Sequence, residues 1–156
     1  MIDCPIPDAD RKLLFDFFWK FSAFECALKR GGFLKPVRKD KRTDAQADWD
    51  KFARKIDGRF VEIASHGFWE AVARINCLSP QRQINAGGKL GWKPVGRGAK
   101  DSDTAYTLKL LRTARNNLFH GGKYQDGSII PEIARDREIL LAALTVLDGC
   151  YELIPR

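Results

Sequence analysis

The sequence predicts an all-α fold, a bundle of four to five helices with a short basic hairpin-like insertion. Apolar residues recur at intervals of three and four along most of the chain, as on the buried face of a helix. The stretch 82–100 breaks this periodicity with glycines and basic residues. With 156 residues and no internal repeat or linker, we expect a single domain over residues 1–156.

The first helix is expected from Asp8 to Lys29, with Gly31-Gly32 ending it. Its apolar stripe consists of Leu13, Leu14, Phe17, Phe18, Phe21, Phe24 and Leu28. Glu25 falls on the same stripe, where a carboxylate needs a partner because burying an unpaired charge is costly. The aromatic residues of 15–24 are too many for one buried face, which indicates a subunit interface on this helix.

Two more helices are expected before the insertion. One runs from about Asp44 to Ile56 and breaks or kinks at Asp57-Gly58. The other carries an apolar pattern from Phe60 to Cys77 and stops before Ser79-Pro80. The following letters, "QINAGGKLGW", predict two very short strands around a glycine-rich turn.

The last two helices flank a turn. The first of them begins after the acidic segment 101–103 and includes Leu108, Leu111 and Leu118. The letters "YQDGSIIP" are typical of a turn, and the final helix is expected from about Glu132.

The charge of the chain favours a polyanionic partner. The net charge is +7 and the isoelectric point is near 9.4. Basic residues gather in 35–42 and in 82–100, two segments with the composition of loops. Surface loops often carry binding groups, so both segments are candidates for contact with phosphate.

The sequence predicts neither a membrane-spanning segment nor a metal site. No apolar run approaches the ~18 residues that span a bilayer, and the first residues lack the features of a signal peptide, so we expect a cytoplasmic protein. The four cysteines are scattered without a C-x-x-C pair, which argues against disulfides and zinc. Cys26 and Cys150 lie near apolar faces and are expected to be buried. We expect no cofactor.

The candidate site lies in "LLRTARNNLFHGGKY", residues 110–124. Asn116 and His120 are four apart and share a helix face, whereas Arg115 and His120 point about 140° apart on an ideal helix. Arg115 and His120 converge only if the helix loosens near its end. Gly121-Gly122 favours such an ending, because glycine readily adopts the left-handed cap.

These residue types suit the cleavage of an RNA phosphodiester by its own 2′-OH. Histidine can carry the proton near neutral pH, and a guanidinium can hold two phosphate oxygens. The Asn116 amide can orient the imidazole or bind an oxygen, and the scheme requires no metal. The alternative is a solvated polar helix end, since an Arg-x-x-x-x-His spacing often occurs by chance.

The segment "RNNLFHGGK", between two amphipathic helices, resembles the signature of HEPN domains, which are small helical bundles. "FECALKRGGF" and "SPQRQINAGGKLGW" resemble one prokaryotic branch of that family. The resemblance covers most of the chain and is weakest over residues 33–60. It implies a metal-independent endoribonuclease that leaves 2′,3′-cyclic phosphate and 5′-OH ends.

The resemblance also implies a homodimer in which two Arg/His motifs face one cleft. Arg115 would be the phosphate clamp, Asn116 its polar neighbour and His120 the catalytic residue. Related domains are toxins, abortive-infection effectors or CRISPR-associated nucleases, so an antitoxin or regulatory partner is a further expectation. Toxins silenced by nucleotidylation carry tyrosine two residues after the histidine, where this chain has Gly122.

Further residues have a functional and a plain structural interpretation. Glu25 can reach Arg115 or His120, or it can be neutralised by Lys29 one turn away. Asn117 is a supporting candidate within the motif. Candidates for RNA contact are Lys123, Arg112, Arg97, Lys93 and Trp92. Charged groups at helix ends are usually just solvated, and Trp92 can either stack on a base or cover the bundle.

Three functions therefore remain open. The first is the ribonuclease, for which Arg115 and His120 are essential. The second is a catalytically inactive HEPN module that binds a nucleotide, RNA or a partner protein. The third is a basic helical adaptor that binds RNA through its loops, for which both motif residues are dispensable.

Overall fold

The computed structural model describes residues 8–37, 44–119, 124–125, 128–129 and 133–155. Its elements, in chain order, are α1 (Asp8–Arg30), α2 (Trp49–Val61), α3 (His66–Leu78), β1 (Arg82–Ala86), β2 (Lys89–Lys93), α4 (Asp103–Phe119), β3 (Tyr124–Gln125), β4 (Ser128–Ile129) and α5 (Ile133–Tyr151). The predicted helical architecture with one hairpin before the motif helix is confirmed. β3 and β4 pair where only a turn was expected.

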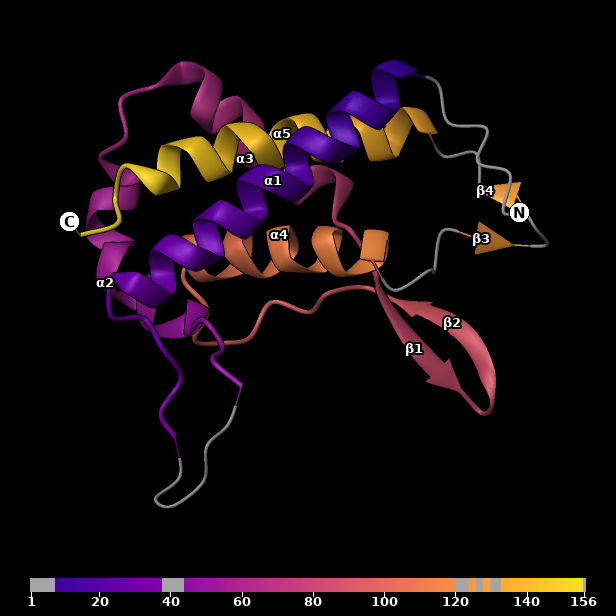
Figure 1. The fold of residues 1–156 in the computed structure, drawn as a ribbon, viewed down its shortest axis with the longest axis horizontal. Helices are drawn as coiled ribbons and strands as arrows, with labels where there is room; N and C mark the ends of the chain where they lie inside the picture. Colours follow the sequence, from indigo (N-terminus) through magenta and orange to yellow (C-terminus); the bar gives the residue numbers. More distant parts are fainter. Residues whose placement is uncertain (1–7, 38–43, 120–123, 126–127, 130–132, 156) are drawn as a thin grey trace.

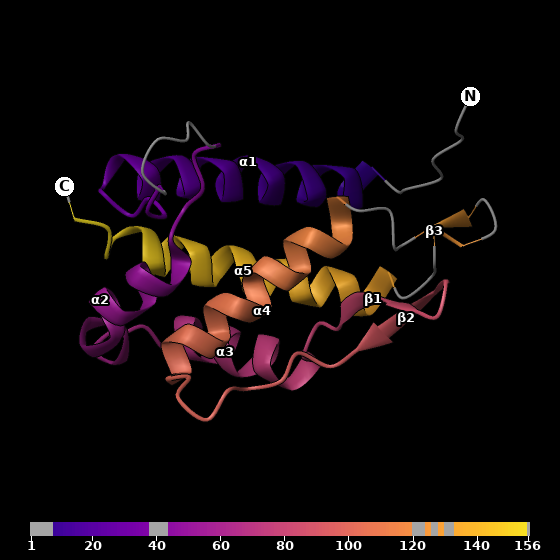
Figure 2. The same cartoon turned by 90° about the horizontal axis from the view of Figure 1, so that it is seen from below.

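α5 contacts α3 and α1 most extensively, whereas α2 packs mainly against α4. α1 and α5 run next to each other, and α4 crosses the bundle in contact with α2, α3 and α5 (Figures 1 and 2). The β1–β2 hairpin projects from the bundle near the C-terminal end of α4 (Figure 1). The hairpin and the end of the motif helix therefore lie in the same region of the molecule.

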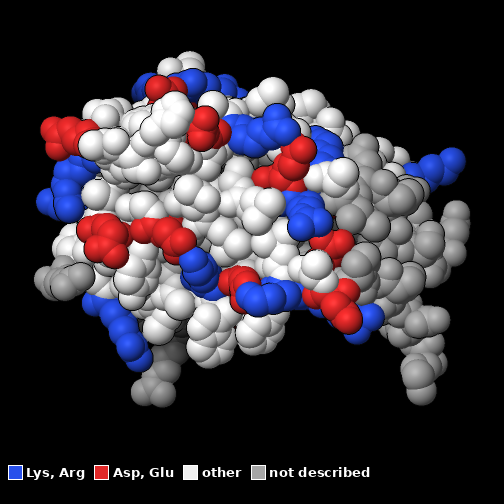
Figure 3. Space-filling view, turned by 90° about the horizontal axis from the view of Figure 1, so that it is seen from above, with Lys and Arg blue, Asp and Glu red and all other residues white. Residues whose placement is uncertain are grey.

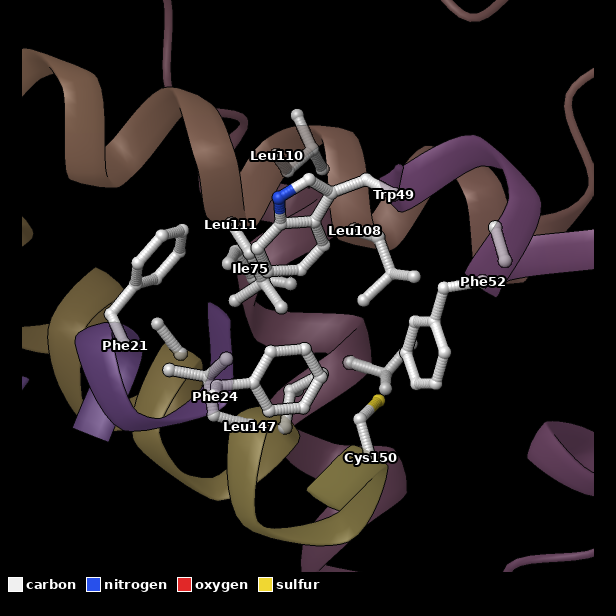
Figure 4. Close-up of a cluster of buried hydrophobic side chains, with 14 of the residues drawn as sticks. Phe21, Phe24, Trp49, Phe52, Ile75, Leu108, Leu110, Leu111, Leu147 and Cys150 are labelled. Atoms are coloured by element: carbon white, nitrogen blue, oxygen red, sulfur yellow. The ribbon is translucent and has the colours of Figure 1, made fainter. Parts of the chain in front are cut away.

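One hydrophobic cluster contains side chains from all five of these helices. Figure 4 shows its centre, where Trp49 of α2 lies among leucines of α4 and phenylalanines of α1. The buried stripe of α1 consists of Phe17, Phe21, Phe24 and Leu28. Phe18, which was predicted to belong to this stripe, is instead 43% exposed. The stripe is narrower than predicted because α5 and α2 cover only one side of α1.

Three predicted bounds were wrong: the start and the end of the second helix, and the start of the third. α2 begins at Trp49, because the Asp48 side chain accepts a hydrogen bond from the Lys51 N–H and caps the helix. α2 also continues through Gly58 to Val61. Glycine within a helix costs about 1 kcal/mol, and burial of Phe60 offsets this cost. Ser65 then caps α3 by accepting a hydrogen bond from Phe68 N–H.

α5 comes very close to α3 at Gly149. A Cβ atom at this position would lie 2.5 Å from Cδ2 of Phe68, whose ring is buried. The neighbouring Cys150 is fully buried as predicted, and this burial raises the pKa of its thiol to about 12. The prediction that Cys26 is buried was wrong: it is exposed, because it lies on the side of α1 away from the stripe.

Two features of the surface stand out. One face mixes acidic and basic side chains, and α1 exposes aromatic side chains. On the face seen in Figure 3, acidic and basic side chains alternate, so no single-sign patch dominates there. Phe15 and Trp19 are 63% and 65% exposed and stack with ring centroids 6.5 Å apart. In the part of the chain that is described, no helix has the length and apolar character required to cross a bilayer.

Candidate functional site

A pocket of about 200 Å³ lies between α1, Lys35, residues 45–47, the start of α2 and the second half of α4. Its charged and polar lining residues are Glu25, Lys29, Lys35, Gln46, Arg112, Arg115 and Asn116. Four of these side chains are cationic and one is a carboxylate. The pocket thus brings together Arg115, Asn116, Arg112 and Glu25, four of the residues that the sequence nominated.

The two arginines of the pocket lie one turn apart on the same face of α4, and aromatic rings hold both. The Arg115 guanidinium carbon lies 5.8 Å from the centroid of the Phe21 ring, and that of Arg112 lies 5.9 Å from the Trp49 ring. The two rings stack on each other with centroids 5.3 Å apart. Because both rings are buried, they provide a rigid floor for the guanidinium groups.

Arg115 is further oriented by its neighbour in the motif. Its Nη1 donates a hydrogen bond of 3.2 Å to Oδ1 of Asn116. The Arg115 side chain is half-buried, whereas Asn116 is exposed at the edge of the pocket. A guanidinium that is partly desolvated and fixed in direction suits the binding of a phosphate, since less conformational entropy is lost on binding.

Glu25 has a hydrogen-bond partner that the sequence did not predict. Its Oε1 accepts a hydrogen bond of 3.2 Å from Nε1 of Trp49. Glu25 is half-buried and lines the same pocket as Arg115 and Lys29. Both of these residues were predicted from the sequence as partners of Glu25. Glu25 therefore fixes the Trp49 ring, on which Arg112 stacks, and also reduces the positive charge of the pocket.

Lys35 and residues 45–47, which precede α2, complete the lining of the pocket. Residues Leu34 and Ala47 form an isolated antiparallel bridge, and the Lys35 N–H donates to the Gln46 carbonyl at 2.9 Å. Lys35 Nζ also donates to Oε1 of Gln46 at 3.2 Å. The sequence predicted phosphate contact for the basic run that begins at Lys35, but it did not predict Gln46, because the bridge joins residues that are far apart in the sequence.

Asn117 acts as a structural link. Its side chain is buried, with 7% exposed, and its Nδ2 donates a hydrogen bond of 2.6 Å to the Gln81 carbonyl just before β1. Asn116 lines the pocket, and Asn117 holds the base of the hairpin. The last turn of α4 therefore lies between the pocket and the β1–β2 hairpin.

The candidate RNA-contact residues of the basic loop divide into two kinds. Arg97 has internal partners: its Nη2 donates to Asp103 Oδ1 at 2.6 Å, and its guanidinium carbon lies 5.6 Å from the Tyr106 ring centroid. These contacts argue for a structural role of Arg97 in the loop. Lys93 is exposed on β2, and Trp92 is half-buried beside it. His120 and Lys123 lie outside the described residues; His120 directly follows Phe119, the last residue of α4.

Asp101 organises the loop that carries Arg97. Its Oδ2 accepts hydrogen bonds from Lys109 Nζ at 2.5 Å and from Gly98 N–H at 2.7 Å. The Lys109 bond, followed by the Gly98 bond, lowers the pKa of this carboxyl below its ordinary value of 3.8.

We expect Asp101→Asn to lower stability by about 1 kcal/mol at neutral pH, because asparagine loses the charge-assisted bond to Lys109. The folded-state pKa of Asp101 is lowered, so the contribution is fully present above pH 3.8 and is lost as the pH falls through the folded-state value. Urea unfolding of both proteins from pH 7 to pH 2 checks this. A difference that stays constant over this range would contradict the assignment.

We expect Glu25→Gln to strengthen the binding of anions to the pocket. Glutamine can still accept the hydrogen bond from Trp49. The substitution, however, removes the one carboxylate that faces the four cations of the pocket. The variant should therefore be slightly less stable without phosphate and gain more thermal stability when phosphate is added. Thermal unfolding with and without inorganic phosphate measures both effects, with Glu62→Gln, an exposed site at the end of α2, as the control. Equal phosphate effects in both variants would show that Glu25 does not face the anion site.

Comparison with protein-family models, with curated proteins and with solved structures gives no match to this chain. Among the described residues, no three His, Cys, Asp or Glu side chains are grouped so that they could hold a metal ion. The functional assignment accordingly rests on the residues of the pocket and on the motif.

Proposed function

We propose that this chain is a HEPN-type, metal-independent endoribonuclease in which Arg115 binds the scissile phosphate and His120 transfers a proton. The observation that carries the proposal is the position of Arg115. It lines a pocket with three other cations, and the Phe21 ring and Asn116 orient its guanidinium. A phosphate in this pocket would gain the charge-assisted hydrogen bonds that cleavage of a phosphodiester requires.

The proposed reaction is a transfer within the RNA strand. The ribose 2′-oxygen bonds to phosphorus and gives up its proton, the bond from phosphorus to the 5′-oxygen breaks, and the 5′-oxygen takes up a proton. The products are a 2′,3′-cyclic phosphate and a 5′-OH end. Arg115 offsets the negative charge that accumulates on the phosphate oxygens, and His120 exchanges the proton near neutral pH.

We further propose that two copies associate so that their motifs share one cleft. The setting we propose is prokaryotic stress or antiviral defence, with an antitoxin or regulatory protein as a partner. The exposed pair Phe15 and Trp19 supports an interface on α1, because large aromatic side chains side by side on a surface favour association. Sedimentation of wild type beside Phe15→Ser/Trp19→Ser tests this point. A monomer in both samples would refute the dimer.

A defined substrate tests the proposed reaction. An oligoribonucleotide should be cleaved to products with cyclic-phosphate ends, and a 2′-deoxy sugar at the cleaved position should abolish cleavage there. Cleavage that tolerates the deoxy sugar would refute the mechanism, because the attacking oxygen is then absent.

A second candidate function is a catalytically inactive module that binds a nucleotide. The pocket favours it too, because one chain alone supplies four cations around about 200 Å³. For this function, titration with a mononucleotide should show binding that depends on Arg112 and Arg115, while RNA remains intact.

A further inference from the structure

The β1–β2 hairpin carries its three cations on one face. In its register Arg82 lies opposite Lys93, and Ala86 lies opposite Lys89. Residues directly opposite each other in an antiparallel pair point to the same face, and positions along a strand alternate. Arg82, Lys89 and Lys93 therefore share one face, whereas Trp92 and Leu90 lie on the other.

Burial shows which face is turned to solvent. Gln83 and Trp92, which pair at the base of the hairpin, are half-buried, whereas their neighbours Arg82 and Lys93 are exposed. At the base of the hairpin, the cationic face is therefore the one turned to solvent, whereas Ile84 farther along the same face is half-buried beside Gly91. Neither strand contains an acidic residue.

The placement of these cations is electrostatically unfavourable when no anion is bound. Arg82 and Lys93 are like charges placed directly opposite each other, a pairing that destabilises an antiparallel ladder. Within the described residues, the side chains of Arg82, Lys89 and Lys93 have no hydrogen bond or ion pair, in contrast to Arg97. A bound polyanion would relieve this repulsion.

We propose that this outward face of the hairpin binds the phosphate backbone of the RNA strand beyond the pocket. The inference rests on the proposed function for the identity of the strand. Lys89 and Lys93 are four residues apart, which separates them by roughly 13 Å along β2 and lets them contact different phosphates. Asn117 fixes the base of the hairpin to the last turn of α4, on whose other side the pocket lies. An RNA strand leaving the pocket would cross this turn to reach the hairpin.

The test measures binding of a fluorescent 20-nucleotide RNA in an Arg115→Ala background, where the proposed cleavage does not interfere. The variant combines Arg82→Gln, Lys89→Gln and Lys93→Gln. The matched control combines Arg30→Gln, Arg54→Gln and Lys55→Gln, which are exposed, lie outside both basic segments and reduce the net charge equally. Loss of three contacts should lower the slope of log affinity against log salt by about 2, and weaken binding by roughly 100-fold at ~0.1 M salt.

The outcomes separate this inference from the proposed function. A hairpin variant that binds RNA as well as the control, with the same salt slope, overturns the inference even if the wild type cleaves RNA. A selective loss of binding in the hairpin variant supports the inference even if the wild type proves unable to cleave. Thermal unfolding of both variants verifies that each is folded.

Discussion

Replacing Arg115 by lysine is expected to slow RNA cleavage by roughly 100- to 1,000-fold, the usual cost of removing one preorganised donor to a reacting oxyanion. Lysine keeps the charge but lacks the planar fork that binds two phosphate oxygens, and it cannot stack on the Phe21 ring in the same way. The loss should fall mainly on kcat, because charge on the phosphate oxygens is greatest in the transition state. Single-turnover cleavage of a labelled oligoribonucleotide measures it.

Arg112→Lys is the matched control for this prediction. Arg112 lines the same pocket, stacks on Trp49 at a similar distance and lies one turn earlier on α4. If Arg115 alone clamps the scissile phosphate, Arg112→Lys should weaken RNA binding with a much smaller effect on kcat. Equal losses in the two variants would show that the pocket acts only as a general cationic surface.

Replacing Gly149 by alanine is expected to destabilise the protein by about 1–3 kcal/mol, the typical cost of overpacking a core. The new methyl group would lie 2.5 Å from Cδ2 of Phe68, and this buried ring also packs edge-on against Phe60 and Trp69. The Phe68 ring therefore has little freedom to move, so α3 and α5 would separate slightly. Denaturant unfolding should show the loss even though alanine is the better helix former.

Gly58→Ala is the control for Gly149→Ala. Gly58 lies within α2, and a Cβ atom there would meet no other heavy atom within 4 Å. Alanine at this position should raise stability by up to about 1 kcal/mol, since it favours the helix and restricts the unfolded chain. A loss of stability at Gly58 as large as that at Gly149 would contradict the close approach of α3 and α5.

Periodicity predicted much of the fold because most of its elements are determined locally. The bounds of α1 and the start of α4 after 101–103 follow from caps and apolar spacing, and the Gly87-Gly88 turn with its short strands was recognised from glycine. The break between α2 and α3 was misplaced at Asp57-Gly58, because the apolar pattern from Phe60 onward was assigned to the third helix. The packing of Phe60 decides how far α2 continues, and the Ser65 cap decides where α3 begins.

The site was predicted in part, for a comparable reason. Arg115, Asn116 and Arg112 belong to one helix, so their proximity follows from sequence spacing. Lys35, Gln46 and Trp49 reach the pocket through a bridge between Leu34 and Ala47 and through packing against α1, neither of which the sequence reveals. The partner of Glu25 was missed because Trp49 comes from a different helix.

The most direct test of the proposed ribonuclease is an incubation of labelled total RNA in excess EDTA, with wild type beside His120→Ala. The account predicts that wild type alone cleaves the RNA and leaves 2′,3′-cyclic phosphate ends, while the folded variant leaves it intact. Equal cleavage by both proteins, or cleavage by wild type that EDTA abolishes, would contradict it.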